Sequence, residues 1–167
     1  MNRTIKLLIL MLFFIRVSAH LYAQSVGYTY KPLAAEGCSM KYCVMKQDTT
    51  YYIVATVSSD RMKFLSEPTM KIRTFKDSVL TFTGKAIDNR SETAGFVTGN
   101  MIFPITEINS TAQFKVTPVE FGMLRDGIAK IRLSMIPMDH ERIFKKDNLG
   151  KKLYKLYLNV KSKEEDF

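Results

Sequence analysis

The sequence is poor in the residues that enzymes use for acid–base and metal chemistry. It holds only two histidines, His20 and His140, and no HExxH, GxSxG or phosphate-cradling glycine motif. The densest cluster is Asp139-His140-Glu141, but neighbouring side chains alternate across a strand and do not face each other on a helix. We therefore interpret this cluster as a solvated connector. We expect no catalytic, cofactor-binding or metal-binding residues and no cofactor.

Cysteine is scarce as well, with only Cys38 and Cys43. No cysteine follows the first apolar run closely, which excludes the lipid-modified cysteine of a bacterial lipoprotein. Two cysteines in an exported protein suggest a disulfide. On one extended strand, however, their Cα atoms would lie about 17 Å apart, against the roughly 4.4–6.8 Å that a disulfide allows. The sequence is therefore compatible with either a disulfide between Cys38 and Cys43 or two free thiols.

Long apolar runs are limited to the N-terminus. Residues 7–15 are apolar, Arg3 and Lys6 precede them, and small residues follow at Ala19 and Ala23. This layout predicts a signal peptide at residues 1–23, because nine residues fall far short of the ~20 that a membrane-spanning helix needs. We expect an exported protein, periplasmic or extracellular, that is not a lipoprotein and has no integral membrane segment in its mature chain.

The remaining residues 24–167 are enough for a single globular β-rich domain. Two pairs of segments, 42–46 with 50–57 and 70–75 with 79–83, have the period-two pattern and the polar connections of hairpins. Residues 85–92 and 106–111 are polar, and we expect a loop and a turn there. Between them, residues 95–105 predict a further strand.

A short helix at residues 118–126 has a clear start. Thr117 and Glu120 have the spacing of a capping box, and Pro118 suits the first helical position. Gly127 is suited to end the helix in the left-handed conformation.

A second helix is expected at residues 148–161. Its apolar positions recur at spacings of three and four, which predicts one buried stripe: Leu149, Leu153, Leu156, Tyr157 and Val160. Lys151, Lys152 and Lys155 lie on the other side. These lysines form a possible surface for an anionic partner; the alternative is that they are only solvated while the helix packs on the sheet.

Strands followed by a helix favour an α+β fold, a mainly antiparallel sheet covered by the C-terminal helix. A β-sandwich with an appended helix is the alternative. Residues 118–133 and 145–154 resemble the back half of small exported bacterial proteins of unknown function, a resemblance that implies no activity.

The sequence therefore favours a non-enzymatic envelope or secreted interaction protein that binds a protein or a surface glycan. Export makes nucleic acid an unsuitable partner, and neither the partner nor the oligomeric state is specified. The alternative is a small periplasmic hydrolase that gathers carboxylates from separate strands, since such a pair leaves no signature in the sequence.

Overall fold

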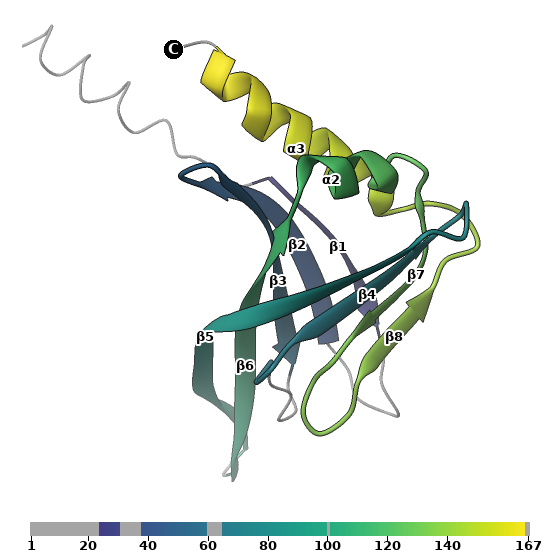
Figure 1. Cartoon of the computed structure of the whole chain (residues 1–167). Coiled ribbons are helices and arrows are strands. Elements are labelled where there is room, and N and C mark those ends of the chain that lie inside the picture. The colour runs from purple at the N-terminus through teal and green to yellow at the C-terminus, as the bar shows by residue number, and fades with distance from the viewer. Residues whose placement is uncertain (1–23, 31–37, 60–64, 100, 166–167) are drawn as a thin grey trace, which may run out of the picture.

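The protein forms a single antiparallel sheet that curls into a half-barrel, with two helices over one of its ends (Figure 1). The computed structural model describes residues 24–30, 38–59, 65–99 and 101–165. The eight strands lie in the order β1-β2-β3-β6-β5-β4-β7-β8. This confirms the predicted mainly antiparallel sheet with a C-terminal helix; the alternative, a two-sheet sandwich, does not form.

Five pairs of consecutive strands are antiparallel neighbours, and β1 and β8 form the two edges of the sheet. In chain order the strands are β1 (Ser25–Tyr30), β2 (Cys38–Gln47), β3 (Thr50–Ser59), β4 (Thr69–Thr74), β5 (Val79–Thr98), β6 (Met101–Val116), β7 (Ile128–Leu133) and β8 (His140–Ile143). The two predicted hairpins are confirmed as β2–β3 and β4–β5. Their turns hold Asp48 and Asp77 at positive φ, a conformation that Asp adopts more readily than most residues.

The prediction of a loop at residues 85–92 and a turn at residues 106–111 is wrong, because both segments lie within the long hairpin β5–β6. The hairpin turns at Gly99, whose φ is +61°. Residues 92–98 and 101–107 pair only with each other in the described chain; we call them the ribbon, which extends beyond the sheet (Figure 1). The polar side chains of these segments resemble those of loops in the sequence, but the backbone of each segment pairs with a neighbouring strand.

Helix α2 (Pro118–Leu124) begins as predicted. The Glu120 amide donates to Thr117 Oγ1 at 3.3 Å, and the Thr117 amide donates to Glu120 Oε2 at 2.7 Å, so the capping box is complete. The helix ends two residues before the predicted boundary, and Gly127 follows at φ +81°.

Helix α3 (Gly150–Glu165) is tied to the barrel at its start by Asp147. The Asp147 carboxylate accepts the backbone N–H groups of Leu149, Gly150 and Lys151, and that of Ile128 at the start of β7. Burial raises the pKa of Asp147, but these four hydrogen bonds outweigh it and hold the pKa below its usual value.

Two glycines permit the close approach at this junction. A Cβ on Gly150 would lie 2.8 Å from both the Ile128 nitrogen and the Leu124 oxygen. A Cβ on Gly127 would lie 2.7 Å from the Asp147 Cβ. The helices and β7 therefore meet with backbone against backbone.

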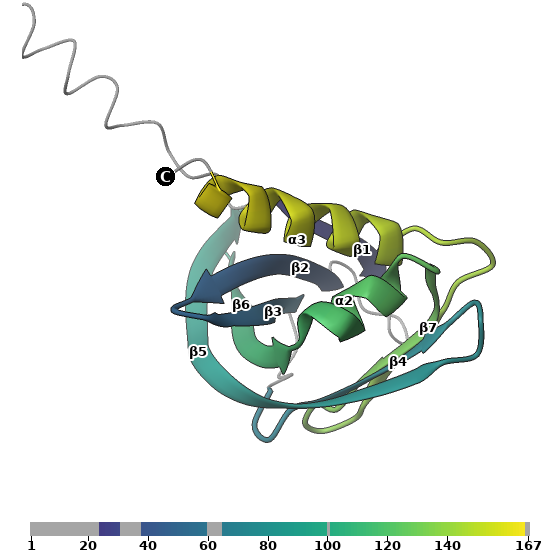
Figure 2. The same cartoon turned by 45° about the horizontal axis from the view of Figure 1, so that its top comes forward.

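The core fills the concave side of the sheet and continues under the helices. The predicted stripe of α3 is largely buried, with Leu149, Leu153, Leu156 and Tyr157 all in the core. The Tyr157 ring stacks on Phe121 of α2 with centroids 4.5 Å apart and meets Tyr51 of β3 edge-on at 5.0 Å. The two helices thus close one end of the barrel (Figure 2), and aromatic side chains pack beneath them.

The edge strands β1 and β8 approach each other through side chains, and no backbone pairing joins them in the described chain. The Tyr28 hydroxyl of β1 lies 3.0 Å from His140 Nε2 of β8 and 3.4 Å from the Tyr42 hydroxyl. The Tyr28 ring also meets Phe144 edge-on at 5.6 Å. Burial raises the pKa of Tyr28 to about 12. We call this contact the seam.

The predicted signal peptide, residues 1–23, lies outside the described residues. Within residues 24–165, as far as they are described, no helix has the length and apolar character needed to cross a bilayer.

Candidate functional site

The outer face of β4 and β7 carries a block of four cations. Alternation along the strands turns Met70, Ile72, Ile131 and Leu133 into the core, which leaves the residues between them on the outside. The antiparallel register sets Lys71 opposite Arg132 and Arg73 opposite Lys130. Like charges placed directly opposite each other in a sheet are destabilising, so this arrangement lowers the stability of the fold. We call Lys71, Arg73, Lys130 and Arg132 the basic face.

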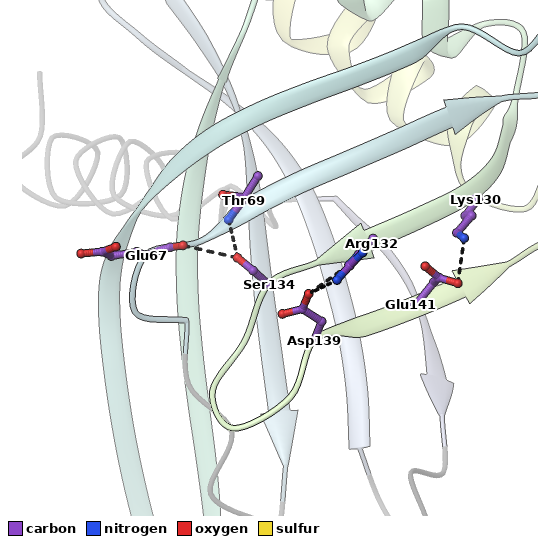
Figure 3. Close-up of polar contacts among 7 residues, drawn as sticks. All are labelled: Glu67, Thr69, Lys130, Arg132, Ser134, Asp139 and Glu141. Atoms are coloured by element: carbon purple, nitrogen blue, oxygen red, sulfur yellow. Dashed lines mark hydrogen bonds and ion pairs between the residues drawn. The ribbon is translucent and has the colours of Figure 1, made fainter.

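Strand β8 and the loop before it supply two carboxylates to the basic face (Figure 3). Asp139 Oδ2 accepts from Arg132 Nε at 2.9 Å and from Arg132 Nη2 at 2.7 Å. Glu141 Oε1 lies 2.8 Å from Lys130 Nζ. Lys71 and Arg73 have no acidic partner among the described residues. Two of the four cations are thus neutralised, and two are available to an anionic ligand.

Hydroxyl groups continue the same face beyond the cations. Ser134 Oγ accepts the Thr69 N–H at 2.6 Å and donates to the Glu67 carbonyl at 3.3 Å, as Figure 3 shows. The Ser134 N–H donates in turn to the Thr69 carbonyl at 2.9 Å. Thr83 of β5 lies opposite Thr69. These bonds add one row to the β4–β7 pairing and fix a rigid, hydroxyl-rich floor beside the basic face.

Three adjoining hollows form one shallow groove along this face. The first, of about 170 Å³, lies among the four cations, Val79 and Glu141. The second, of about 250 Å³, shares Lys71 and Arg132 with the first and adds Thr69, Ser134 and Asp139. The third, of about 440 Å³, shares Thr69 with the second and reaches Lys85. A shallow, open groove suits an extended ligand, whereas small molecules are usually bound in clefts that enclose them.

The cluster Asp139-His140-Glu141 is divided by the sheet. Asp139 and Glu141 lie on the outer face, whereas His140 is buried on the inner side at the seam. Its interpretation as a solvated connector is therefore wrong for His140, which is the first residue of β8. Among the described residues, no group of three or more His, Cys, Asp and Glu side chains is placed to hold a metal ion.

The two cysteines are free in the structure, so the possible disulfide between Cys38 and Cys43 is not formed. Their spacing on β2 places them on opposite faces of the strand. Cys38 is buried with its Sγ 3.2 Å from Ser59 Oγ. Cys43 is half-buried, and burial raises the pKa of its thiol.

The predicted anionic-partner surface and the groove are separate features. Lys151, Lys152 and Lys155 are exposed on α3, which lies over the capped end of the barrel (Figure 1). Sequence reasoning missed the basic face, although it predicted residues 70–75 as a strand, in which Lys71 and Arg73 alternate with apolar residues. The missing information was that β4 and β7, which are distant in the chain, are neighbours in the sheet.

The segments that carry the resemblance to small exported bacterial proteins, residues 118–133 and 145–154, meet in the structure. They form α2, β7 and the start of α3, and the bond from Ile128 to Asp147 joins them. The chain matches no protein-family model, no curated protein and no solved structure. The resemblance therefore stays a prediction.

Proposed function

We propose that this chain is an exported, non-enzymatic interaction protein that binds an acidic surface glycan along the groove. The observation that carries the proposal is the pair Lys71 and Arg73, two cations without an acidic partner among the described residues, on the open groove. Carboxylate or sulfate groups of a polysaccharide would complement them, and the Arg73 guanidinium has the fork geometry that binds such groups in a bidentate manner.

The groove lining favours a glycan over a protein partner. The cores of protein–protein interfaces are depleted in charged residues and are built around large apolar or aromatic anchors. Here the floor is made of charged and hydroxyl side chains, with Val79 as an exposed apolar residue at one end. Hydroxyls such as those of Thr69, Thr83 and Ser134 are suited to hydrogen-bond with sugar hydroxyls.

The hydrolase alternative finds less support in the groove. A glycosidase needs two carboxylates beside the scissile bond, and one of them donates a proton. Asp139 and Glu141 are each engaged in an ion pair, Asp139 with Arg132 at 2.7 Å and Glu141 with Lys130 at 2.8 Å. Such groups are suited to orient Arg132 and Lys130 rather than to act as acids.

The proposal is tested by titrating the protein with a polyanionic polysaccharide such as dextran sulfate, with neutral dextran for comparison. We expect binding to the anionic polymer alone, weakened by added salt. Lys71→Glu with Arg73→Glu should weaken it at least tenfold. The matched control is Lys151→Glu with Lys155→Glu, which changes the net charge equally on another surface. If both double variants lose the same affinity for the polysaccharide, the loss is due to net charge alone. That result would contradict a binding site on the groove.

A second arm separates binding from hydrolysis. Asp139→Asn with Glu141→Gln frees Arg132 and Lys130, so we expect tighter binding of the polyanion. The length of the polysaccharide after long incubation with the wild-type protein is measured by gel filtration. Shortening that disappears in this double variant would establish the hydrolase alternative in place of the proposal.

A further inference from the structure

A second surface of mixed character covers the outside of the capped end. On α3, Lys151, Lys155 and Leu158 follow one another at spacings of four and three, opposite the buried stripe. On α2, Val119 and Met123 lie four residues apart on the side away from the buried Phe121 and Leu124. We call Lys151, Lys155, Leu158, Val119 and Met123 the helical surface.

Both helices contribute to one surface because they lie side by side over the same end of the barrel (Figure 2). The stacking of Phe121 on Tyr157 joins their inner sides. Their outer sides therefore both face away from the sheet. Neither side belongs to the groove, which is built from β4, β5, β7 and the residues around them.

The charge of the helical surface is not neutralised from within the helix. Asp147, the acid nearest these lysines in the sequence, has its carboxylate engaged by four backbone N–H groups, three at the start of α3 and one at the start of β7. Lys151 and Lys155 are exposed and have no ion pair in the described part of the chain. The surface thus presents positive charge to its surroundings.

Large apolar side chains are exposed among these lysines. Val119 is 70% exposed, Leu158 is 42% exposed and Met123 is 37% exposed. A hydrated polysaccharide makes few favourable contacts with such side chains. The bilayer interface accommodates both kinds, because lysines reach the headgroup phosphates while apolar side chains enter the boundary of the acyl chains.

We propose that the helical surface docks onto bilayers that contain anionic phospholipids. Each lysine near an anionic leaflet strengthens association by roughly fivefold. Replacing Lys151 and Lys155 should therefore weaken the anionic part of binding by about 25-fold.

The test is cosedimentation of the full chain with two kinds of vesicle, one of phosphatidylcholine alone and one with phosphatidylglycerol added. Apolar contacts contribute to binding of both kinds, so the difference between the two kinds measures the electrostatic part of binding. We expect stronger binding to the vesicles with phosphatidylglycerol, lost at high salt. Lys151→Glu with Lys155→Glu should reduce it by more than about 25-fold, because each substitution also adds a negative charge. Leu158→Ser should reduce it as well.

Lys71→Glu with Arg73→Glu serves as the matched control and should leave vesicle binding unchanged, since these residues lie on the groove. Equal binding to both vesicle types would overturn the proposal, as would equal losses in the two double variants. A third result would also overturn it: Lys151→Glu with Lys155→Glu weakens the binding of dextran sulfate but leaves vesicle binding intact. The helical surface would then bind a soluble polymer and not a membrane. If the groove does not bind glycan, Lys71→Glu with Arg73→Glu will leave dextran sulfate binding unchanged. That outcome would contradict the proposed function but would not affect the vesicle experiment.

Discussion

The capped end of the barrel and the ribbon differ in how many other elements pack against them. At the capped end, α2, α3 and β7 meet with backbone in close contact at Gly127 and Gly150, and aromatic rings fill the space below. The ribbon continues β5 and β6 with pairing to each other alone in the described chain. A two-stranded hairpin by itself is marginally stable in water, so the ribbon depends on the sheet from which it extends. Stability is thus concentrated where the helices cover the sheet.

The largest effect on stability is expected from shortening a buried side chain at the capped end. Leu153 is fully buried, and Leu153→Ala should lower the free energy of unfolding by about 2–5 kcal/mol, measured by urea denaturation. Leu158→Ala on the same helix is the control, with an expected change within about 0.5 kcal/mol. Similar losses from the two substitutions would mean that α3 does not pack on the core as described.

The junction of α3 with β7 should show a dependence on pH. The pKa of Asp147 is lower in the fold than in the unfolded chain, so its contribution to stability is complete above about pH 4 and is lost as pH falls through the folded value. We expect Asp147→Asn to be less stable than the wild type at neutral pH. The gap should close on acidification below about pH 4, and a gap of constant size would contradict this role of the carboxylate.

The cap of α2 is expected to contribute less. Thr117→Ala removes the hydroxyl that accepts the Glu120 N–H, and the expected loss is about 1 kcal/mol in the free energy of unfolding. Thr117→Ser, which retains the hydroxyl, should restore most of that loss in the same thermal melts.

The smallest effect should come from the ribbon, where two similar threonine pairs allow a direct comparison. Thr93 and Thr106 are joined at 3.0 Å on the ribbon and are exposed, whereas Thr56 and Thr111 are joined at 3.1 Å within the sheet and are partly buried. We expect Thr93→Ala to change stability by less than about 0.5 kcal/mol and Thr111→Ala to cost about 1 kcal/mol. The reverse order would show that the ribbon is a stabilising element.

Sequence reasoning succeeded where local chemistry decides the structure. The capping box at Thr117 and the stripe of α3 follow from spacing alone, and both are confirmed, with shifts of up to four residues at the helix ends. It failed for residues 85–92 and 106–111, whose polar residues form strands because a partner strand satisfies their backbone.

The candidate groove was beyond sequence reasoning for a different reason. Lys71 and Arg73 lie 57 or more residues before Lys130 and Arg132 in the chain, and only the sheet order brings them together. The alternation that places each pair outward was visible in the sequence. Which strands would be neighbours depends on the whole fold.

The seam between β1 and β8 has a consequence for the order of folding. Tyr28 and His140 are 112 residues apart in sequence, whereas the β2–β3 and β4–β5 hairpins close over short turns. The entropy lost on closing a loop grows with its length, so the hairpins should assemble early and the seam should close last. Contacts made after the transition state affect unfolding more than folding. Tyr28→Phe should therefore speed unfolding in stopped-flow experiments while the folding rate stays nearly constant. In this order of folding, β1 is the first described strand in the sequence and the last to dock onto the barrel.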